Sequence, residues 1–229
     1  MLSYLAFALG FCLAAVAVAF AADGTDCSST ELVEVDIGDQ RFAIPRPYIA
    51  RIARESDGSI QFVRLSVLWP SLEPLTHENK HLWTPDLPGR QTIDIGILSR
   101  PRDGYSVLQR AIELGLLDRR VEPGPFGLDK YEKDLPEARR TMRYFTSTDE
   151  AYFTPVRMPI VFDCRDHFTW DAHRHMKLEP TCETNYSLED GGAGLYYRFY
   201  RKNLESWLAL DTAIRKLVSS FRCNKDTQS

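Results

Sequence analysis

The clearest secondary-structure pattern of the chain runs from Gly194 to Cys223 and reads GLYYRFYRKNLESWLALDTAIRKLVSSFRC. Its first part, residues 195–200, is rich in aromatic side chains and predicts a β-strand. The part that follows carries apolar residues three and four positions apart, which is the spacing of a helix with one buried face. These residues are Leu204, Trp207, Leu208, Ile214, Leu217, Val218 and Phe221. We therefore expect a helix from about Asn203, its candidate N-cap, to Phe221, packed on a sheet that contains the aromatic strand.

Segments typical of strands occupy much of the remaining chain. The aromatic strand is expected to form a hairpin with residues 177–187, across the glycine-rich turn at 188–194. Residues 48–54 are expected to form a short helical turn, and residues 106–119 a second amphipathic helix. Further extended segments are expected at 32–37, 41–44, 60–69, 92–98, 141–145 and 152–164. The sequence thus predicts an α+β fold with a mainly antiparallel sheet and two amphipathic helices.

The N-terminal segment indicates the compartment. Leu2–Ala22 has no charged side chain, and residues 19–21 (AFA) form a small-x-small cleavage pattern. We interpret residues 1–21 as a secretory signal peptide. Because a run of about 20 apolar residues can also span a bilayer, an uncleaved inner-membrane anchor facing the periplasm is the alternative. Residues 22–229 are expected to form one α+β domain in the periplasm or outside the cell, with two lobes and a seam near Pro123 as a variant of that arrangement.

Four cysteines follow this segment, at positions 27, 164, 182 and 223. An even number of cysteines in an exported protein is typical of disulfide bonds. Three pairings are possible, and two bridges are favoured. Cys164–Cys182 would join two neighbouring strand ends, and Cys27–Cys223 would tie the first ordered residues to the end of the last helix. A metal site built from the four cysteines is less consistent with the sequence, which has no CxxC pair.

Charge and motifs argue against several classes of function. The formal net charge of −4 is unlike that of a dedicated nucleic-acid binder, which needs a basic face. The chain has no GxSxG nucleophile elbow, and its glycine-rich stretch lacks the Lys-Ser/Thr ending of a phosphate loop. Two disulfides would leave no cysteine as a nucleophile. We therefore expect no cofactor, and a non-enzymatic protein is favoured over an enzyme.

A histidine cluster offers the alternative chemistry. His167, His173 and His175 lie close together, and the last two would project from one face if this segment were extended. Asp166, Asp171 or His167 could complete a zinc or copper site with His173 and His175. This pattern supports a second hypothesis, a metal-binding protein or a metal-dependent hydrolase. A solvated loop that carries histidines is the simpler interpretation.

Two stretches suit recognition of another protein. Arg46 and Tyr48 lie at a proline-bounded corner, and Trp69 and Trp83 lie in a long proline-rich segment. Tryptophan, tyrosine and arginine are the residue types that dominate binding hot spots. These four residues are our candidate binding residues. In the alternative interpretation, the tryptophans belong to the core and the arginines are solvated.

The order of three patterns resembles a group of small exported proteobacterial proteins, some of which are periplasmic immunity proteins against secreted toxins. The patterns are Ile44–Ile49 (IPRPYI), Leu68–Pro74 (LWPSLEP) and the closing aromatic strand with its helix. The resemblance implies a protein that covers the active site of a toxin, and it carries over no functional residue. Our leading hypothesis is an exported, non-enzymatic protein that binds another protein, such as a toxin or effector. A membrane-tethered component of the cell envelope is a further alternative.

Overall fold

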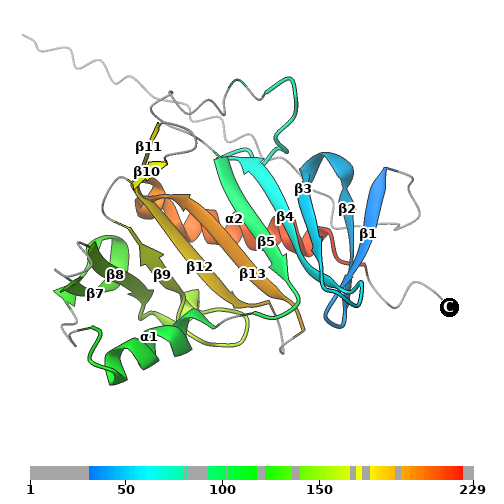
Figure 1. Cartoon of the computed structure of the whole chain (residues 1–229). Coiled ribbons are helices and arrows are strands. Elements are labelled where there is room, and N and C mark those ends of the chain that lie inside the picture. Colours follow the sequence, from blue (N-terminus) through cyan, green and yellow to red (C-terminus); the bar gives the residue numbers. More distant parts are fainter. Residues whose placement is uncertain are drawn as a thin grey trace, which may run out of the picture.

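A long antiparallel sheet dominates the computed structural model, which describes residues 31–79, 81, 92–101, 103–117, 122–135, 140–165, 169–171, 176–188 and 192–223. Within these residues the sheet has nine strands in the order β3-β4-β5-β13-β12-β9-β8-β7-β6 (Figure 1). In that order the strands are β3 (Ile49–Arg54), β4 (Ile60–Leu68), β5 (Thr92–Leu98), β13 (Gly194–Tyr200), β12 (Thr181–Ser187), β9 (Val161–Cys164), β8 (Arg140–Ser147), β7 (Leu128–Leu135) and β6 (Glu122–Pro123). The aromatic strand of the sequence analysis is β13, which lies inside the sheet with β5 and β12 as its neighbours.

Two separate hairpins and two α-helices accompany the sheet. β1 (Leu32–Ile37) pairs with β2 (Gln40–Pro45), and β10 (Thr169–Asp171) pairs with β11 (Met176–Leu178). The helices are α1 (Gly104–Glu113) and α2 (Trp207–Ser220). Short 3-10 helices are η1 (Arg46–Tyr48), η3 (Pro125–Gly127), η5 (Glu150–Tyr152) and η6 (Arg201–Ser206). The predicted α+β fold, its mainly antiparallel sheet and the β12–β13 hairpin are confirmed.

Helix α2 packs on one face of the sheet, as its apolar spacing predicted (Figure 1). The buried residues of the helix include Trp207, Leu210, Ile214, Leu217 and Val218. They share one core cluster with inward-facing residues of the central strands, among them Val63, Leu65, Ile93, Ile95, Leu195 and Phe199. Since burial of one large apolar side chain contributes roughly 1.5–3 kcal/mol, this layer is a main source of stability.

The start of α2 differs from the prediction. The helix begins at Trp207, not at Asn203, because the chain leaves β13 through η6. The backbone N–H of Arg201 donates to the carbonyl of Pro180 over 2.9 Å, so the tight turn is fixed to the start of β12. Leu204 is already buried in this turn. A 3-10 turn at a helix N-terminus is common because it lets the chain change direction within a few residues.

Helix α1 is shorter than the predicted 106–119. The Asp103 carboxylate accepts hydrogen bonds from the backbone N–H groups of Tyr105 and Ser106, and this cap sets the start at Gly104. Gly115 has a φ of 66°, a left-handed conformation that ends helices and suits glycine. Below the helix, a second core cluster contains Leu108, Ala111, Leu117, Tyr144 and Val161.

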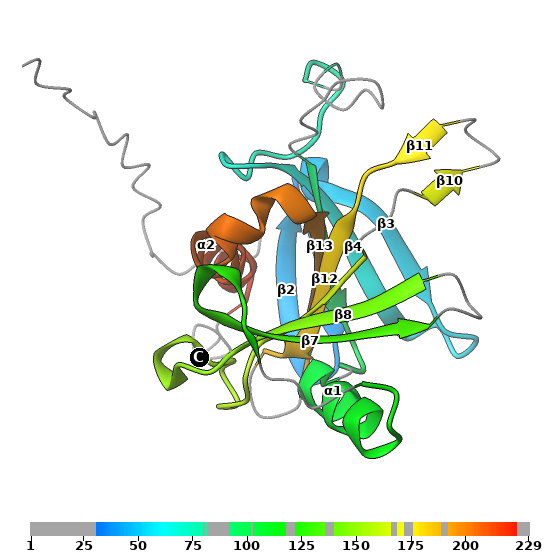
Figure 2. The same cartoon turned by 90° about the vertical axis from the view of Figure 1, so that its left-hand side faces the viewer.

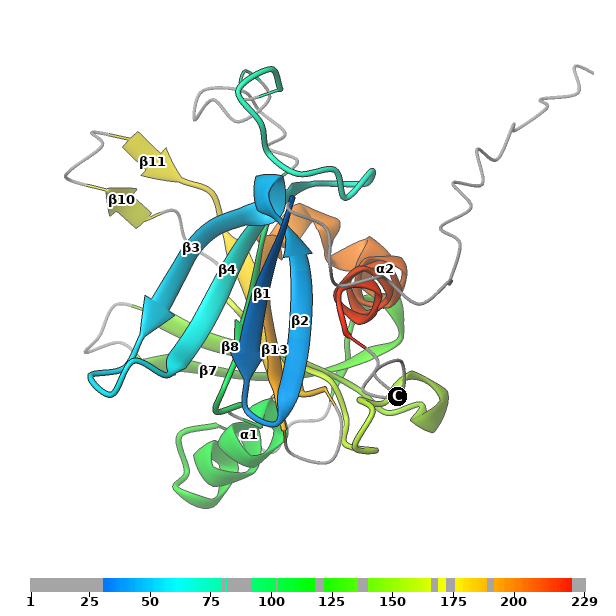
Figure 3. The same ribbon diagram turned by 90° about the vertical axis from the view of Figure 1, so that its right-hand side faces the viewer.

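The β1–β2 hairpin is attached to the end of α2 (Figure 3). The backbone N–H of Ala43 donates to the carbonyl of Phe221 over 2.7 Å, and that of Cys223 donates to the carbonyl of Arg41 over 2.9 Å. Tyr48 lies edge-to-face against Phe221, with ring centroids 5.2 Å apart. The first described strands and the last described residues are therefore neighbours in space.

Strand β3 corrects the prediction of a helical turn at residues 48–54. Only Arg46–Tyr48 form a 3-10 turn, and Ile49–Arg54 pair with β4. The strand forms because β4 offers an edge for pairing, while Ile49 and Ile52 pack against the core. Two register shifts interrupt the pairing, which is typical of an edge strand.

Strand β7 was missed because Leu128–Leu135 is mostly charged. Pairing with β8 places Arg143 opposite Glu132, with 2.7 Å between Nε and Oε2. Lys130, two residues earlier on β7, lies 2.5 Å from the same oxygen. These cations lower the pKa of Glu132 to about 2, Arg143 through its hydrogen bond being the larger cause. A charge pair between the two strands thus stabilises this part of the sheet, where alternating apolar residues are missing.

The predicted extended segment 152–164 is a strand only in β9, Val161–Cys164. Proline lacks the N–H that a sheet ladder needs, and Pro155 and Pro159 precede the strand. Cys164 of β9 is opposite Cys182 of β12 in the sheet register, and their sulfurs form the predicted disulfide. It is the one disulfide between two described residues. The second predicted bridge involves Cys27, which lies outside the described residues, so Cys27–Cys223 stays a prediction.

Strand β5 precedes Pro123 in the chain and β13 follows it, and the two strands pair directly. Strands from both sides of the predicted seam therefore belong to the same sheet. The leader segment, residues 1–21, lies outside the described part of the chain. Among the described residues, no helix is both long enough and apolar enough to cross a membrane.

Candidate protein-binding face

The face of the sheet opposite α2 carries the candidate site. Along β4, β5 and β13 every second residue points toward α2 and is fully buried, as Leu65, Ile95 and Tyr197 are. The residues between them point to the other face, and several of these, such as Phe62, Asp94 and Tyr196, keep part of their surface exposed. Figure 2 shows α2 on one side of the strands, with α1 and the β10–β11 hairpin near the two ends of the opposite face.

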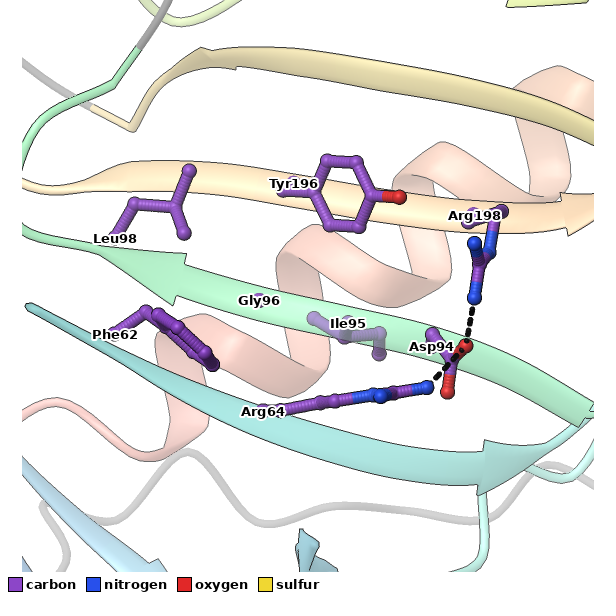
Figure 4. Close-up of a pocket in the computed structure, with 8 residues that line it drawn as sticks. All are labelled: Phe62, Arg64, Asp94, Ile95, Gly96, Leu98, Tyr196 and Arg198. Atoms are coloured by element: carbon purple, nitrogen blue, oxygen red, sulfur yellow. Dashed lines mark hydrogen bonds and ion pairs between the residues drawn. The ribbon is translucent and has the colours of Figure 1, made fainter. Parts of the chain in front are cut away.

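A cavity of about 320 Å³ lies on this face, over the centre of β4, β5 and β13. Six of its lining residues define what we call the arginine–tyrosine face. They are Phe62, Arg64, Asp94, Leu98, Tyr196 and Arg198, shown with Ile95 and Gly96 in Figure 4. The sheet register brings these residues together: Arg64 and Tyr196 are both paired with Gly96, and Arg198 is paired with Asp94.

Two arginines share one carboxylate in this face (Figure 4). Nη2 of Arg64 lies 2.7 Å from Oδ2 of Asp94, and Nη2 of Arg198 lies 2.9 Å from the same oxygen. The hydroxyl of Ser66 donates to Oδ1 of Asp94 over 3.4 Å. The side chains of Arg64 and Arg198 are 45% and 40% exposed, so both guanidinium groups are held in place yet open to a ligand.

Tyr196 forms one wall of the cavity, and a glycine makes room for it. A Cβ at Gly96 would lie 3.4 Å from Cδ1 of Tyr196 and 3.5 Å from Cδ2 of Leu98. The hydroxyl of Tyr196 donates to Oε2 of Glu183 on β12 over 3.0 Å. Burial and the neighbouring Glu183 carboxylate raise the pKa of Tyr196, so the phenol stays protonated at neutral pH.

Phe62 forms another wall, on β4. The guanidinium carbon of Arg51, on the edge strand β3, lies 5.9 Å from the centre of the Phe62 ring. That distance is within reach of a cation–π contact. The face therefore combines exposed cationic groups with an apolar, partly aromatic cavity, an arrangement suited to binding.

The predicted binding residues lie elsewhere, at one end of the sheet. Arg46 is exposed in η1, whereas Tyr48 and Trp69 are partly buried against the core. Strand β3 begins beside the end of β4. Tyr48, just before β3, and Trp69, just after β4, therefore lie at the same end of the sheet. The segment after Trp69 folds back on β4, where the N–H of Leu75 donates to the carbonyl of Ser66 over 3.1 Å.

The other predicted site residues lie outside the part of the chain that the structure describes. They are Trp83, His167, His173 and His175. In the described part of the chain, no group of three or more metal-ligating side chains is found. Zinc binding by the histidine cluster therefore stays a prediction.

Sequence reasoning missed Asp94, Tyr196 and Arg198. The only available signal was alternation, because each polar or aromatic residue lies between apolar residues in its strand. Alternation shows that such residues leave the core, yet it does not show that β4, β5 and β13 are neighbours.

Comparison with solved structures finds the same fold in an immunity protein of the Stenotrophomonas maltophilia type IV secretion system. The superposition has a TM-score of 0.57 at 17% sequence identity, and it covers 85% of this chain and 94% of that chain. No protein-family model and no curated protein sequence matches the chain. The resemblance to immunity proteins noted in the sequence is thus found again in the fold.

Proposed function

We propose that this chain is an exported immunity-type protein, which binds a toxin or effector protein and blocks it without catalysis of its own. The observation that carries the proposal is the fold shared with an immunity protein over most of both chains. An inhibitor of this kind must present a preformed surface, because ordering a flexible surface would reduce affinity. The arginine–tyrosine face is such a surface, since its charged groups are fixed by hydrogen bonds on three strands.

Export is the second part of the proposal. The uncharged leader segment and the Cys164–Cys182 bridge support it, because disulfides persist in oxidising compartments such as the periplasm. In this proposal residues 1–21 are cleaved as a signal peptide, and Cys27 pairs with Cys223. N-terminal sequencing of the mature protein tests the cleavage, and an N-terminus at Met1 would support the membrane-anchored alternative.

The test of function is protection. Each candidate toxin or effector encoded near this gene is expressed in the periplasm of a host, with and without this chain. We expect the chain to restore growth and to form a stable complex with that toxin in size-exclusion chromatography. If every neighbouring effector stays toxic and none binds, the proposed function is wrong.

A further inference from the structure

We propose that the arginine–tyrosine face binds a protein segment in which a carboxylate side chain lies next to an aromatic side chain. The carboxylate is held by Arg64 and Arg198, and the aromatic ring enters the cavity beside Phe62, Leu98 and Tyr196. This inference deepens the proposed function, from which it takes the idea that the ligand is a protein. It adds the position of the contact and the chemistry of the partner.

The charge of the face selects a carboxylate. The face and its immediate neighbours hold three cations, on Arg51, Arg64 and Arg198. They meet two carboxylates, Asp94 and Glu183, which leaves a net charge of +1 on a chain whose formal net charge is −4. A guanidinium has five N–H donors, and among the described residues the hydrogen bonds of both arginines to Asp94 use only Nη2. Nε and Nη1 remain for a ligand. Two nitrogens of one guanidinium suit the two oxygens of a carboxylate, and such charge-assisted bonds are the stronger ones.

Asp94 explains why the arginines are ready to bind. Its Oδ2 accepts from both guanidinium groups, so it holds two like charges close together, one from each of the strands β4 and β13 that flank β5. The side chain of Asp94 is only 24% exposed, so it is less accessible than the side chains of Arg64 and Arg198, which are 45% and 40% exposed. Binding to arginine side chains that are already fixed costs less conformational entropy than binding that must first order them.

The apolar part of the face selects a ring. The cavity has a volume of about 320 Å³ and is floored by Gly96, where the missing side chain leaves space between Tyr196 and Leu98. Aromatic pairs favour offset or edge-to-face contacts, which Phe62 and Tyr196 can both offer to an inserted ring. Arginines with aromatic neighbours are also typical of the energetic centre of protein interfaces.

A nucleic acid would fit this face less well. A protein that binds single strands combines stacking rings with a groove that is basic along its length. Here the hydroxyl of Tyr196 lies 3.0 Å from the carboxylate of Glu183. A second carboxylate, Asp94, lies between the two arginines. A phosphate backbone crossing the face would pass both carboxylates.

The first experiment maps a defined probe on the purified protein. The probe is the capped peptide acetyl-Gly-Glu-Trp-Gly-amide, titrated while amide chemical shifts are followed by NMR. We expect shifts centred on the backbone of Gly96, Tyr196 and Arg198, with a Kd on the order of 1 mM. Peptides with Lys for Glu, or with Gly for Trp, should bind about tenfold more weakly. Shifts centred elsewhere, no shifts, or stronger binding of a short single-stranded oligonucleotide would overturn the proposal.

Variants then separate charge from shape. Arg64→Gln removes one cation and should weaken the peptide about tenfold. Gly96→Val keeps the charges and fills the floor of the cavity, so it should weaken the Trp peptide and spare the Gly-for-Trp control peptide. Arg110→Gln is the matched control, because Arg110 is an exposed arginine on α1, paired with Glu113 and outside the face. The wild-type map decides the matter even if a variant does not fold.

Failure of this inference can be told from failure of the proposed function. The peptide titration needs no toxin. A toxin that binds the chain and is unaffected by Arg64→Gln and Gly96→Val would overturn the face as the contact and leave the immunity role standing. Peptide binding at the face, without protection by the chain from any neighbouring effector, would support the face and overturn the immunity role.

Discussion

The phenolic hydroxyl of Tyr197 donates a 2.8 Å hydrogen bond to Oδ1 of Asp211, which joins the middle of β13 to helix α2. The hydroxyl of Tyr186, on β12, donates to the same oxygen over 2.5 Å. Nη2 of Arg215, one turn further along α2, lies 2.6 Å from Oδ2 of Asp211. One buried carboxylate thus connects two strands with the helix that covers them, and its charge is balanced by one guanidinium.

Asp211→Ala should destabilise the protein by about 3 kcal/mol or more, because it leaves two buried hydroxyls and a partly buried guanidinium without their acceptor. Urea unfolding followed by circular dichroism measures the loss. Thr212→Ala is the control, since Thr212 is the next residue of α2 and is exposed. We expect it to change stability by no more than about 0.5 kcal/mol. A loss below about 1 kcal/mol for Asp211→Ala would contradict the structural role of the carboxylate.

Stability should fall steeply at alkaline pH. Burial, and then the charge of Asp211, raise the pKa of both Tyr186 and Tyr197 well above 10. The unfolded chain therefore releases these two protons first, so the stabilising effect is complete below about pH 10 and is lost as pH rises above it. The two groups together give a slope of about 2.7 kcal/mol per pH unit. Tyr197→Phe removes one of them and should lower the measured slope by about 1.4 kcal/mol per pH unit. Phenolate absorbance that appears before unfolding in the wild type and is missing in Tyr197→Phe would contradict the prediction.

Acid also lowers stability, through a carboxylate on strand β7. The pKa of Glu132 is lowered to about 2, first by the hydrogen bond from Arg143 and then by Lys130. A lowered pKa contributes stability that is present above the ordinary value near 4.5 and is lost as pH falls toward 2. Glu132→Gln should therefore be less stable than the wild type at neutral pH and nearly as stable at the acid end of this range. A difference that is unchanged across the range would show that the charge has no role.

The Cys164–Cys182 bridge closes a loop with a sequence separation of 18 residues. On the chain-entropy model a loop of that size contributes about 3 kcal/mol. The double substitution of both cysteines by Ala should lower stability by roughly that amount in urea unfolding. Thiol counting on the unreduced protein provides the check on both predicted bridges. If the protein is exported with two disulfides, the mature chain shows no free thiol, and four free thiols would contradict export.

Zinc binding by the histidine cluster has a direct test. The protein is expressed with added zinc, dialysed and subjected to elemental analysis, together with the variant His173→Ala. Our leading hypothesis expects far less than one equivalent of metal in both proteins. Stoichiometric zinc that is lost in His173→Ala would support the alternative of a metal-dependent protein.

Much of the secondary structure follows from local patterns. Strands with clear apolar alternation, such as β4 and β5, and the helix α2 with its three-and-four spacing were predicted close to their true positions. The pairing of Cys164 with Cys182 was also predicted, because both lie near strand ends. Where local patterns were weak the predictions were wrong: Ile49–Arg54 is a strand only because β4 is beside it, and the charged strand β7 depends on β8.

Apolar periodicity along the chain was enough to show which residues leave water in the strands and helices where that pattern is clear. The order of the patterns also indicated the immunity-type likeness. That Arg64, Asp94 and Arg198 meet follows from the three-dimensional fold and from no local pattern. Asp94 and Arg198 are 104 residues apart, and their contact depends on β5 pairing with β13. Local physics sets the alternation within one strand, whereas strand order is set by the packing of the whole sheet on α2.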